Sequence, residues 1–215
     1  MDRQRRVVRE LLDAHGRTYA DEAGIRLKDT PQPLYRLLVL AHLLSARIRA
    51  SVALATARSL HEAGLRDPRR MAEAGWQERV DALGRGGYRR YDERTATQLG
   101  EAAELLNERW GGDLRRLRRE ADGEVPELRH LLQEFPGIGP AGADIFLREA
   151  QGVWQEAAPY LDAKALQGAE RLKLPKDTEH LVELAGGTAP AVLAAALVRA
   201  AVDKEVAEDT LRRAG

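Results

Sequence analysis

The chain of 215 residues is long enough for one large domain or two small helical lobes with a real core. Apolar residues make up 44% of it and charged residues 32%, and no apolar run approaches the roughly 18 residues that cross a bilayer. It contains 0 Cys, which excludes disulfides, Cys-ligated zinc, iron–sulfur clusters and Cys nucleophiles. The five His residues lack metal-type spacing, so we expect no metal or cofactor. The charged N-terminus has no apolar signal core, so we expect a cytoplasmic protein.

Apolar residues recur at helical spacing almost throughout, which predicts an all-α protein. Pro31 precedes the second predicted helix, Pro68 opens the fourth, and Pro126 lies in the first turn of another. The predicted helices in chain order are 2–14, 34–47, 51–62, 68–74, 76–83, 90–109, 113–119, 126–134, 140–150, 160–171, 177–185 and 189–206. The last is apolar nearly all round in its first half, so we expect it to be buried, against 2–14.

The most informative segment, residues 131–150, reads LLQEFPGIGPAGADIFLREA. Pro136 ends one helix, because proline disfavours the α region at the residue before it. Gly137 and Gly139 permit positive φ and a close backbone approach, and Pro140 suits the first position of the next helix. The segment therefore predicts a tight turn between two helices.

Such a turn presents backbone N–H groups at a helix N-terminus, which form an anion site without any charged side chain. Small side chains follow the turn, so a phosphate could reach these amides. The candidate residues for this contact are Gly137, Ile138, Gly139, Ala141, Gly142 and Ala143. A plain helical hairpin that uses glycine only for a sharp reversal explains the pattern equally well.

The hairpin resembles that of the helix-hairpin-helix DNA glycosylases, the superfamily of endonuclease III. Three further segments resemble this superfamily: Leu43–Arg47 (LLSAR) at a helix end, the Gly86–Tyr88 turn, and Gly123–Glu127 (GEVPE) before the hairpin. Together the resemblance covers roughly residues 30 to 175. It implies an all-α fold of two lobes, one of them a six-helix barrel. The expected barrel lobe spans 28–150, and 1–27 with 151–215 form the second lobe.

The resemblance also implies a catalytic residue. In this superfamily a catalytic Asp follows the hairpin helix at the start of the next helix, and Asp162 occupies that position. A fixed carboxylate can stabilise the oxocarbenium character of the sugar, or activate water, as an N-glycosidic bond breaks. Alternatively, Asp162 is only an N-cap, since Asp is common at helix starts.

Two departures from the superfamily limit the expected chemistry. Members that also cut the strand carry a Lys in the hairpin, which forms a Schiff base with the sugar. Here that position is Ala141, which makes AP lyase activity doubtful and implies a monofunctional enzyme that uses water. Lys164 should point away from Asp162. Endonuclease III also carries four Cys around an iron–sulfur cluster, and this chain has none.

The resemblance places further candidates near a flipped nucleotide. Arg47 lies where the family has a base-opening wedge residue, and an Arg can fill the gap left by the flipped base. Ser45 precedes it in the same helix end. His42, Tyr88 and Arg89 are weaker candidates for the base pocket, because a solitary His on an apolar helix and a Tyr at a turn usually serve packing.

We therefore expect a nucleoid-associated, monomeric DNA glycosylase that flips and hydrolytically excises a damaged base from double-stranded DNA. The net charge of +0 lacks the usual basic excess of a DNA binder, although a local basic face can be balanced elsewhere. Two alternatives stay open: a catalytically silent hairpin protein that recognises damaged or bent DNA, and a helical protein–protein interaction module.

Overall fold

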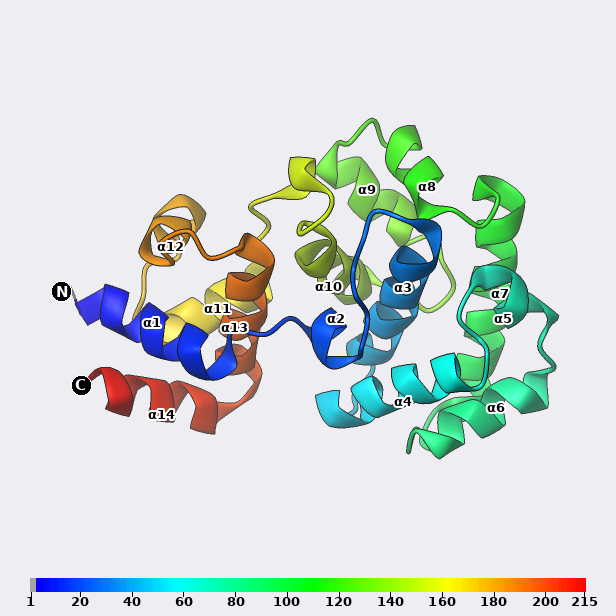
Figure 1. Cartoon of the computed structure of the whole chain (residues 1–215), viewed down its shortest axis with the longest axis horizontal. Helices are drawn as coiled ribbons and strands as arrows, with labels where there is room; N and C mark the ends of the chain where they lie inside the picture. Colours follow the sequence, from blue (N-terminus) through cyan, green and yellow to red (C-terminus); the bar gives the residue numbers. More distant parts are fainter. Residues whose placement is uncertain (1–2) are drawn as a thin grey trace. The chain divides into compact units, whose positions relative to one another are not determined.

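The computed structural model describes residues 3–215, and within them every regular element is a helix (Figure 1). The helices are α1 (Arg3–His15), α2 (Tyr19–Glu22), α3 (Pro31–Ser45), α4 (Ala50–Glu62), α5 (Pro68–Glu73), α6 (Trp76–Arg85), α7 (Asp92–Trp110), α8 (Leu114–Glu120), α9 (Val125–Leu132), α10 (Pro140–Ala150), α11 (Ala163–Arg171), α12 (Thr178–Leu184), α13 (Pro190–Val202) and α14 (Lys204–Ala214), with a 3₁₀ turn at Gln155–Ala157. The prediction of an all-α protein is confirmed. Among the described helices, none is long and apolar enough to span a bilayer.

The chain divides into two compact units, and the division falls inside α10. One unit comprises Ala20–Leu147. In it α3 packs against α4 and α8, and α7 packs against α5, α6 and α8. Helix α3 is buried along nearly its whole length, from Leu34 to Leu43, so it forms the core of this unit.

The other unit comprises the described residues up to Tyr19 together with Arg148–Gly215. Its central helix is α13, which is rich in small residues and packs against α11, α1 and α14. A Cβ on Gly168 of α11 would lie 1.8 Å from the Leu197 carbonyl oxygen of α13. Glycine is required there because the two backbones are in contact. The predicted packing of the apolar C-terminal helix against the N-terminal helix is confirmed.

Several helix ends differ from the predictions for local reasons. Helix α2 was not predicted, since four residues are too few to show helical periodicity. The predicted helix 189–206 is two helices, because Asp203 is extended and its side chain caps α14 through the Glu205 N–H. The predicted helix 160–171 begins only at Ala163, after the capping residue Asp162. Asp2, the predicted start of the first helix, lies outside the described residues.

Candidate functional site

The hairpin has the predicted form of a tight turn between α9 and α10. Gly137 adopts a φ of 85°, and the Ile138 N–H donates to the Phe135 carbonyl oxygen at 2.9 Å. Gly139 is not in the positive-φ region, so the expectation of positive φ at both glycines is correct only for the first. The backbone conformation therefore requires a glycine at position 137 and not at position 139.

The exposed side of the turn carries donors without an internal partner. Gly139 and Ala141 are exposed, and the structure gives their N–H groups no acceptor among the described residues. Gly142 is buried, and its N–H also has no acceptor within residues 3–215. Ala143 is fully buried and its N–H donates to the Gly139 carbonyl oxygen at 3.0 Å, which removes it from the free donors. The free N–H groups at the start of α10 can therefore donate hydrogen bonds to an anion.

A buried histidine packs against the turn at Gly137. His42 of α3 is 7% exposed, and its Nε2 lies 3.3 Å from Gln98 Oε1 of α7. A Cβ on Gly137 would lie 2.2 Å from that same Nε2 atom. Burial lowers the pKa of His42 to about 4, although the bond with Gln98 opposes this shift. His42 is therefore neutral near pH 7 and acts as a packing support of the hairpin.

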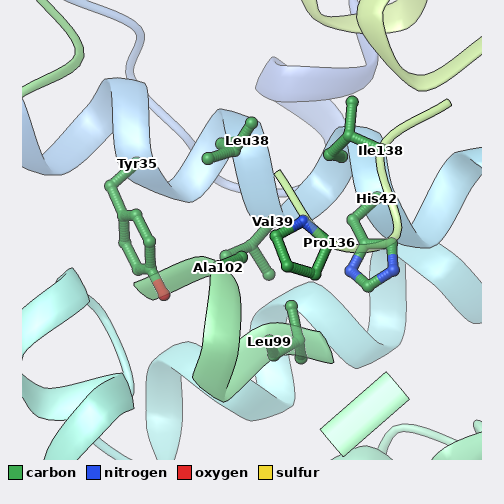
Figure 2. Close-up of a pocket in the computed structure, with 8 residues that line it drawn as sticks. All are labelled: Tyr35, Leu38, Val39, His42, Leu99, Ala102, Pro136 and Ile138. Carbon is green, nitrogen blue, oxygen red and sulfur yellow. The ribbon is translucent and has the colours of Figure 1, made fainter. Parts of the chain in front are cut away.

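The hairpin also covers an apolar space between α3 and α7, shown in Figure 2. Pro136 and Ile138 of the turn face Val39 of α3 and Leu99 of α7 across it. The accessible space amounts to about 10 Å³, enough for about one water molecule and too small for a base. Ile138 is thus an anchor of the turn and presents little side chain to solvent.

The end of α3 lies beside the second hairpin helix. A Cβ on Gly142 would be 3.7 Å from Ser45 Cβ, and the Ser45 hydroxyl donates to the His42 carbonyl oxygen at 2.7 Å. Two residues beyond Ser45, Arg47 is exposed in the segment that links α3 and α4. The structure therefore brings Ser45 to the hairpin and leaves Arg47 accessible.

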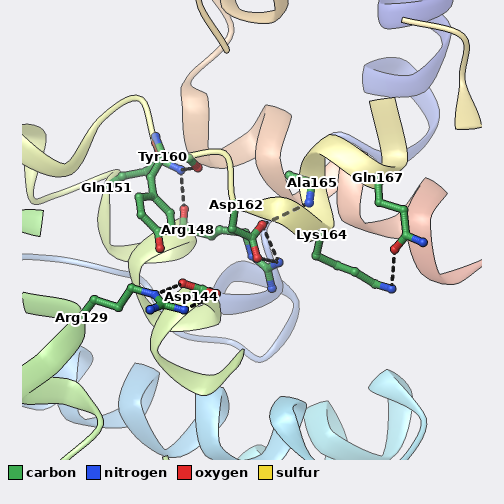
Figure 3. A network of polar contacts seen from close by, with 9 residues as sticks. All are labelled: Arg129, Asp144, Arg148, Gln151, Tyr160, Asp162, Lys164, Ala165 and Gln167. Carbon is green, nitrogen blue, oxygen red and sulfur yellow. Dashed lines mark hydrogen bonds and ion pairs between the residues drawn. The ribbon is translucent and has the colours of Figure 1, made fainter. Parts of the chain in front are cut away.

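The other base-pocket candidates occupy different environments. Tyr88 is 3% exposed, and its hydroxyl lies 3.0 Å from Thr95 Oγ1, so it packs within the core of its unit. Arg89 is exposed on the loop before α7. Lys164 Nζ donates to Gln167 Oε1 at 2.8 Å, and Figure 3 shows it turned toward that residue.

Asp162 lies at the start of α11, and its carboxylate is buried although part of the residue is exposed. Its side chain is 8% exposed and accepts the Ala165 N–H at 3.1 Å, which makes it the N-cap of the helix. The guanidinium of Arg148, also 8% exposed, donates from Nη1 to both carboxylate oxygens at 3.1 Å (Figure 3). The N-cap alternative is therefore correct as a description of the geometry, and a catalytic role is compatible with it.

A buried glutamine holds the loop that leads to Asp162. Gln151 Nε2 donates to the Tyr160 carbonyl oxygen at 3.0 Å, and the Tyr160 N–H donates to Gln151 Oε1 at 2.7 Å. Gln151 Nε2 also donates to the Arg148 carbonyl oxygen at 2.8 Å. The sequence analysis did not identify Arg148 or Gln151 as site residues. Arg148 follows the apolar residues Ile145–Leu147 in α10 and Gln151 comes directly after the helix, so both are polar residues next to an apolar segment. Within residues 3–215, no three His, Asp or Glu side chains are grouped to hold a metal ion.

Comparison with known proteins adds evidence at the level of the fold. No protein-family model matches the chain, and no curated protein matches its sequence. A trapped covalent endonuclease III–DNA intermediate, the estranged-adenine complex, is similar over 93% of this chain and 85% of its own, with 17% identity and a TM-score of 0.52. A non-covalent endonuclease III–DNA complex is similar over the same shares, with 15% identity and a TM-score of 0.53. The chain therefore has the all-α fold of these endonuclease III structures.

Proposed function

We propose that this chain binds double-stranded DNA through its hairpin and hydrolytically excises a damaged base, with Asp162 as the catalytic carboxylate. The observation that carries the proposal is the exposed start of α10, where the N–H groups of Gly139 and Ala141 have no acceptor within the described part of the chain. A phosphodiester supplies the acceptors that these groups lack. The similar solved structures are complexes of endonuclease III with DNA, which supports the same partner.

The chemistry follows from a carboxylate that is ordered and mostly withdrawn from water. Asp162 is fixed by Ala165 and Arg148, and a fixed anion can stabilise the positive charge that develops on the sugar as the base leaves. Ala141 offers no amine for a Schiff base, and Lys164 is bonded to Gln167. We propose a monomeric, cofactor-free and monofunctional enzyme that uses water and leaves an abasic site.

One observation favours a second function. The Arg148 guanidinium already balances the charge of Asp162, and a compensated carboxylate attracts a cationic sugar less strongly. A silent protein that recognises damaged DNA would keep the same hairpin and use Asp162 only to start α11. The two functions differ in base release and share DNA binding.

The hairpin contact is tested by Ala141→Asp. An acidic side chain in the first turn of a helix stabilises that helix, whereas it repels a phosphate placed there. We expect unchanged or higher thermal stability and a DNA dissociation constant raised at least about tenfold. Gln77→Asp is the matched control, since it places the same charge in the first turn of α6. Equal DNA affinity of the Ala141→Asp and Gln77→Asp variants would exclude the hairpin as the contact.

Excision is tested on duplexes that each carry one lesion, chosen among oxidised pyrimidines, alkylated purines and deaminated bases. Strand breaks are read with and without alkali, which separates base release from lyase activity. The wild-type chain should give alkali-dependent breaks, and Asp162→Asn should abolish them while it keeps DNA binding. Salt-dependent binding without base release on any lesion would establish the silent function instead.

A further inference from the structure

The two oxygens of the Asp162 carboxylate are used unequally. Oδ1 accepts both the Ala165 N–H and Arg148 Nη1, each at 3.1 Å. Oδ2 accepts Arg148 Nη1 at 3.1 Å and no other donor among residues 3–215. An ionised carboxylate offers about four lone-pair directions, two on each oxygen. Oδ1 is therefore occupied by structural bonds, and Oδ2 keeps one direction for a further partner.

Arg148 is itself held in place. It is buried near the C-terminal end of α10, and Gln151 Nε2 donates to its carbonyl oxygen at 2.8 Å. Gln151 also binds both backbone groups of Tyr160, two residues before Asp162. The side chain and the backbone of Arg148 are thus both tied to the segment that carries the carboxylate (Figure 3).

We infer that Arg148 is a positioning residue, which turns the Asp162 carboxylate so that Oδ2 is the oxygen available to the sugar or to the attacking water. This inference rests on the proposed glycosylase function. A buried carboxylate with only one N–H donor would be poorly compensated and would turn toward solvent. Arg148 compensates its charge inside the protein and fixes its orientation through both oxygens.

The kinetic test compares Arg148→Gln and Arg148→Lys in single-turnover excision. Gln keeps a donor without the charge, and we expect a rate about 100-fold below wild type with an unchanged DNA dissociation constant, since small misplacement of a reacting group has effects of this size. Lys keeps the charge, and we expect it to restore the rate to within about tenfold of wild type. Wild-type rates in the Gln variant, or equal losses in both variants, would overturn the inference.

The matched control is Arg129→Gln. Arg129 of α9 donates from Nε to Asp144 Oδ1 of α10, the helix of Arg148, at 2.7 Å. The variant therefore breaks an ion pair of α10 that does not involve Asp162. We expect its excision rate to stay within about twofold of wild type, because this half-buried pair makes no recorded contact with Asp162. A loss as large as that of Arg148→Gln would show a general effect of breaking an ion pair on α10, and would overturn a specific positioning role.

A second readout does not need activity. The backbone amide resonance of Ala165 reports the cap made by Asp162. We expect Arg148→Gln to shift this resonance as Asp162→Ala does, and Arg148→Lys to leave it near the wild-type position. An Ala165 amide that is unmoved in Arg148→Gln would overturn the inference. If Arg148→Gln does not fold, Arg148→Lys carries the test. An excision rate about 100-fold below wild type, or an Ala165 resonance shifted as in Asp162→Ala, would then overturn the inference. If wild type releases no base, the proposed function fails and the Ala165 resonance alone decides the role of Arg148.

Discussion

Replacement of Gly137 by Ala tests the link between the hairpin and the core beneath it. The new Cβ would lie 2.2 Å from His42 Nε2, 2.8 Å from His42 Cε1 and 2.9 Å from Gln98 Oε1. Contacts this short require His42 or the turn to move. The position also has a φ of 85°, which side chains with a Cβ rarely adopt.

The magnitude follows from the two causes. A residue with a Cβ in the left-handed region costs about 1 to 2 kcal/mol. Overpacking of a filled site costs about 1 to 3 kcal/mol, and His42 cannot move away freely because it is buried against Gln98. We therefore expect the free energy of unfolding to fall by about 2 to 5 kcal/mol.

Equilibrium unfolding in urea measures this loss, with Gly139→Ala as the matched control. A Cβ on Gly139 would meet nothing within 4 Å, so this variant should stay within about 1 kcal/mol of wild type. The double variant Gly137→Ala/His42→Ala should be more stable than the sum of the single effects predicts, because it removes the collision. The reasoning is refuted if Gly137→Ala and Gly139→Ala unfold at the same urea concentration.

Two further predictions concern stability. Because the folded pKa of His42 lies at about 4, below its unfolded value of 6.5, its contribution is complete above pH 6.5 and is lost as the pH falls toward 4. The loss of about 3 kcal/mol should appear in urea unfolding across this range and should be absent in His42→Gln. Gly168→Ala should lower the unfolding free energy by about 3 kcal/mol or more, since its Cβ would overlap the Leu197 carbonyl oxygen. Gly152→Ala, whose Cβ makes only ordinary contacts, should unfold like wild type in the same assay.

The helical architecture could be predicted from the sequence because each signal is local. Pro68 and Pro126 lie at helix starts, as their missing N–H groups favour, and the apolar spacing gives the buried faces. The turn at Gly137 could be predicted for the same reason. The break at Asp203 could not be found, because the apolar pattern of α13 and the residues of α14 read as one continuous helix.

The environments of the site residues depend on contacts between distant segments. His42 and Gln98 are 56 residues apart in the sequence, so the support of the turn cannot be read from either helix alone. The partnership of Arg148 with Asp162 likewise requires the loop between them to fold back. Motif positions therefore predicted the candidate site residues, whereas their burial and their hydrogen-bond partners came only from the structure.

The hydrogen bonds between Gln151 and the Tyr160 backbone determine where the chain tolerates a change in length. The side chain of Gln151 binds the backbone of Tyr160, so the loop of residues 152–159 is closed at its two ends by hydrogen bonds. Gln155 and Glu156 are exposed in this loop, so residues can be added or removed there while Asp162 stays paired with Arg148. The distance along the chain between the hairpin and Asp162 can therefore change by a few residues while the pairing of Asp162 with Arg148 is kept.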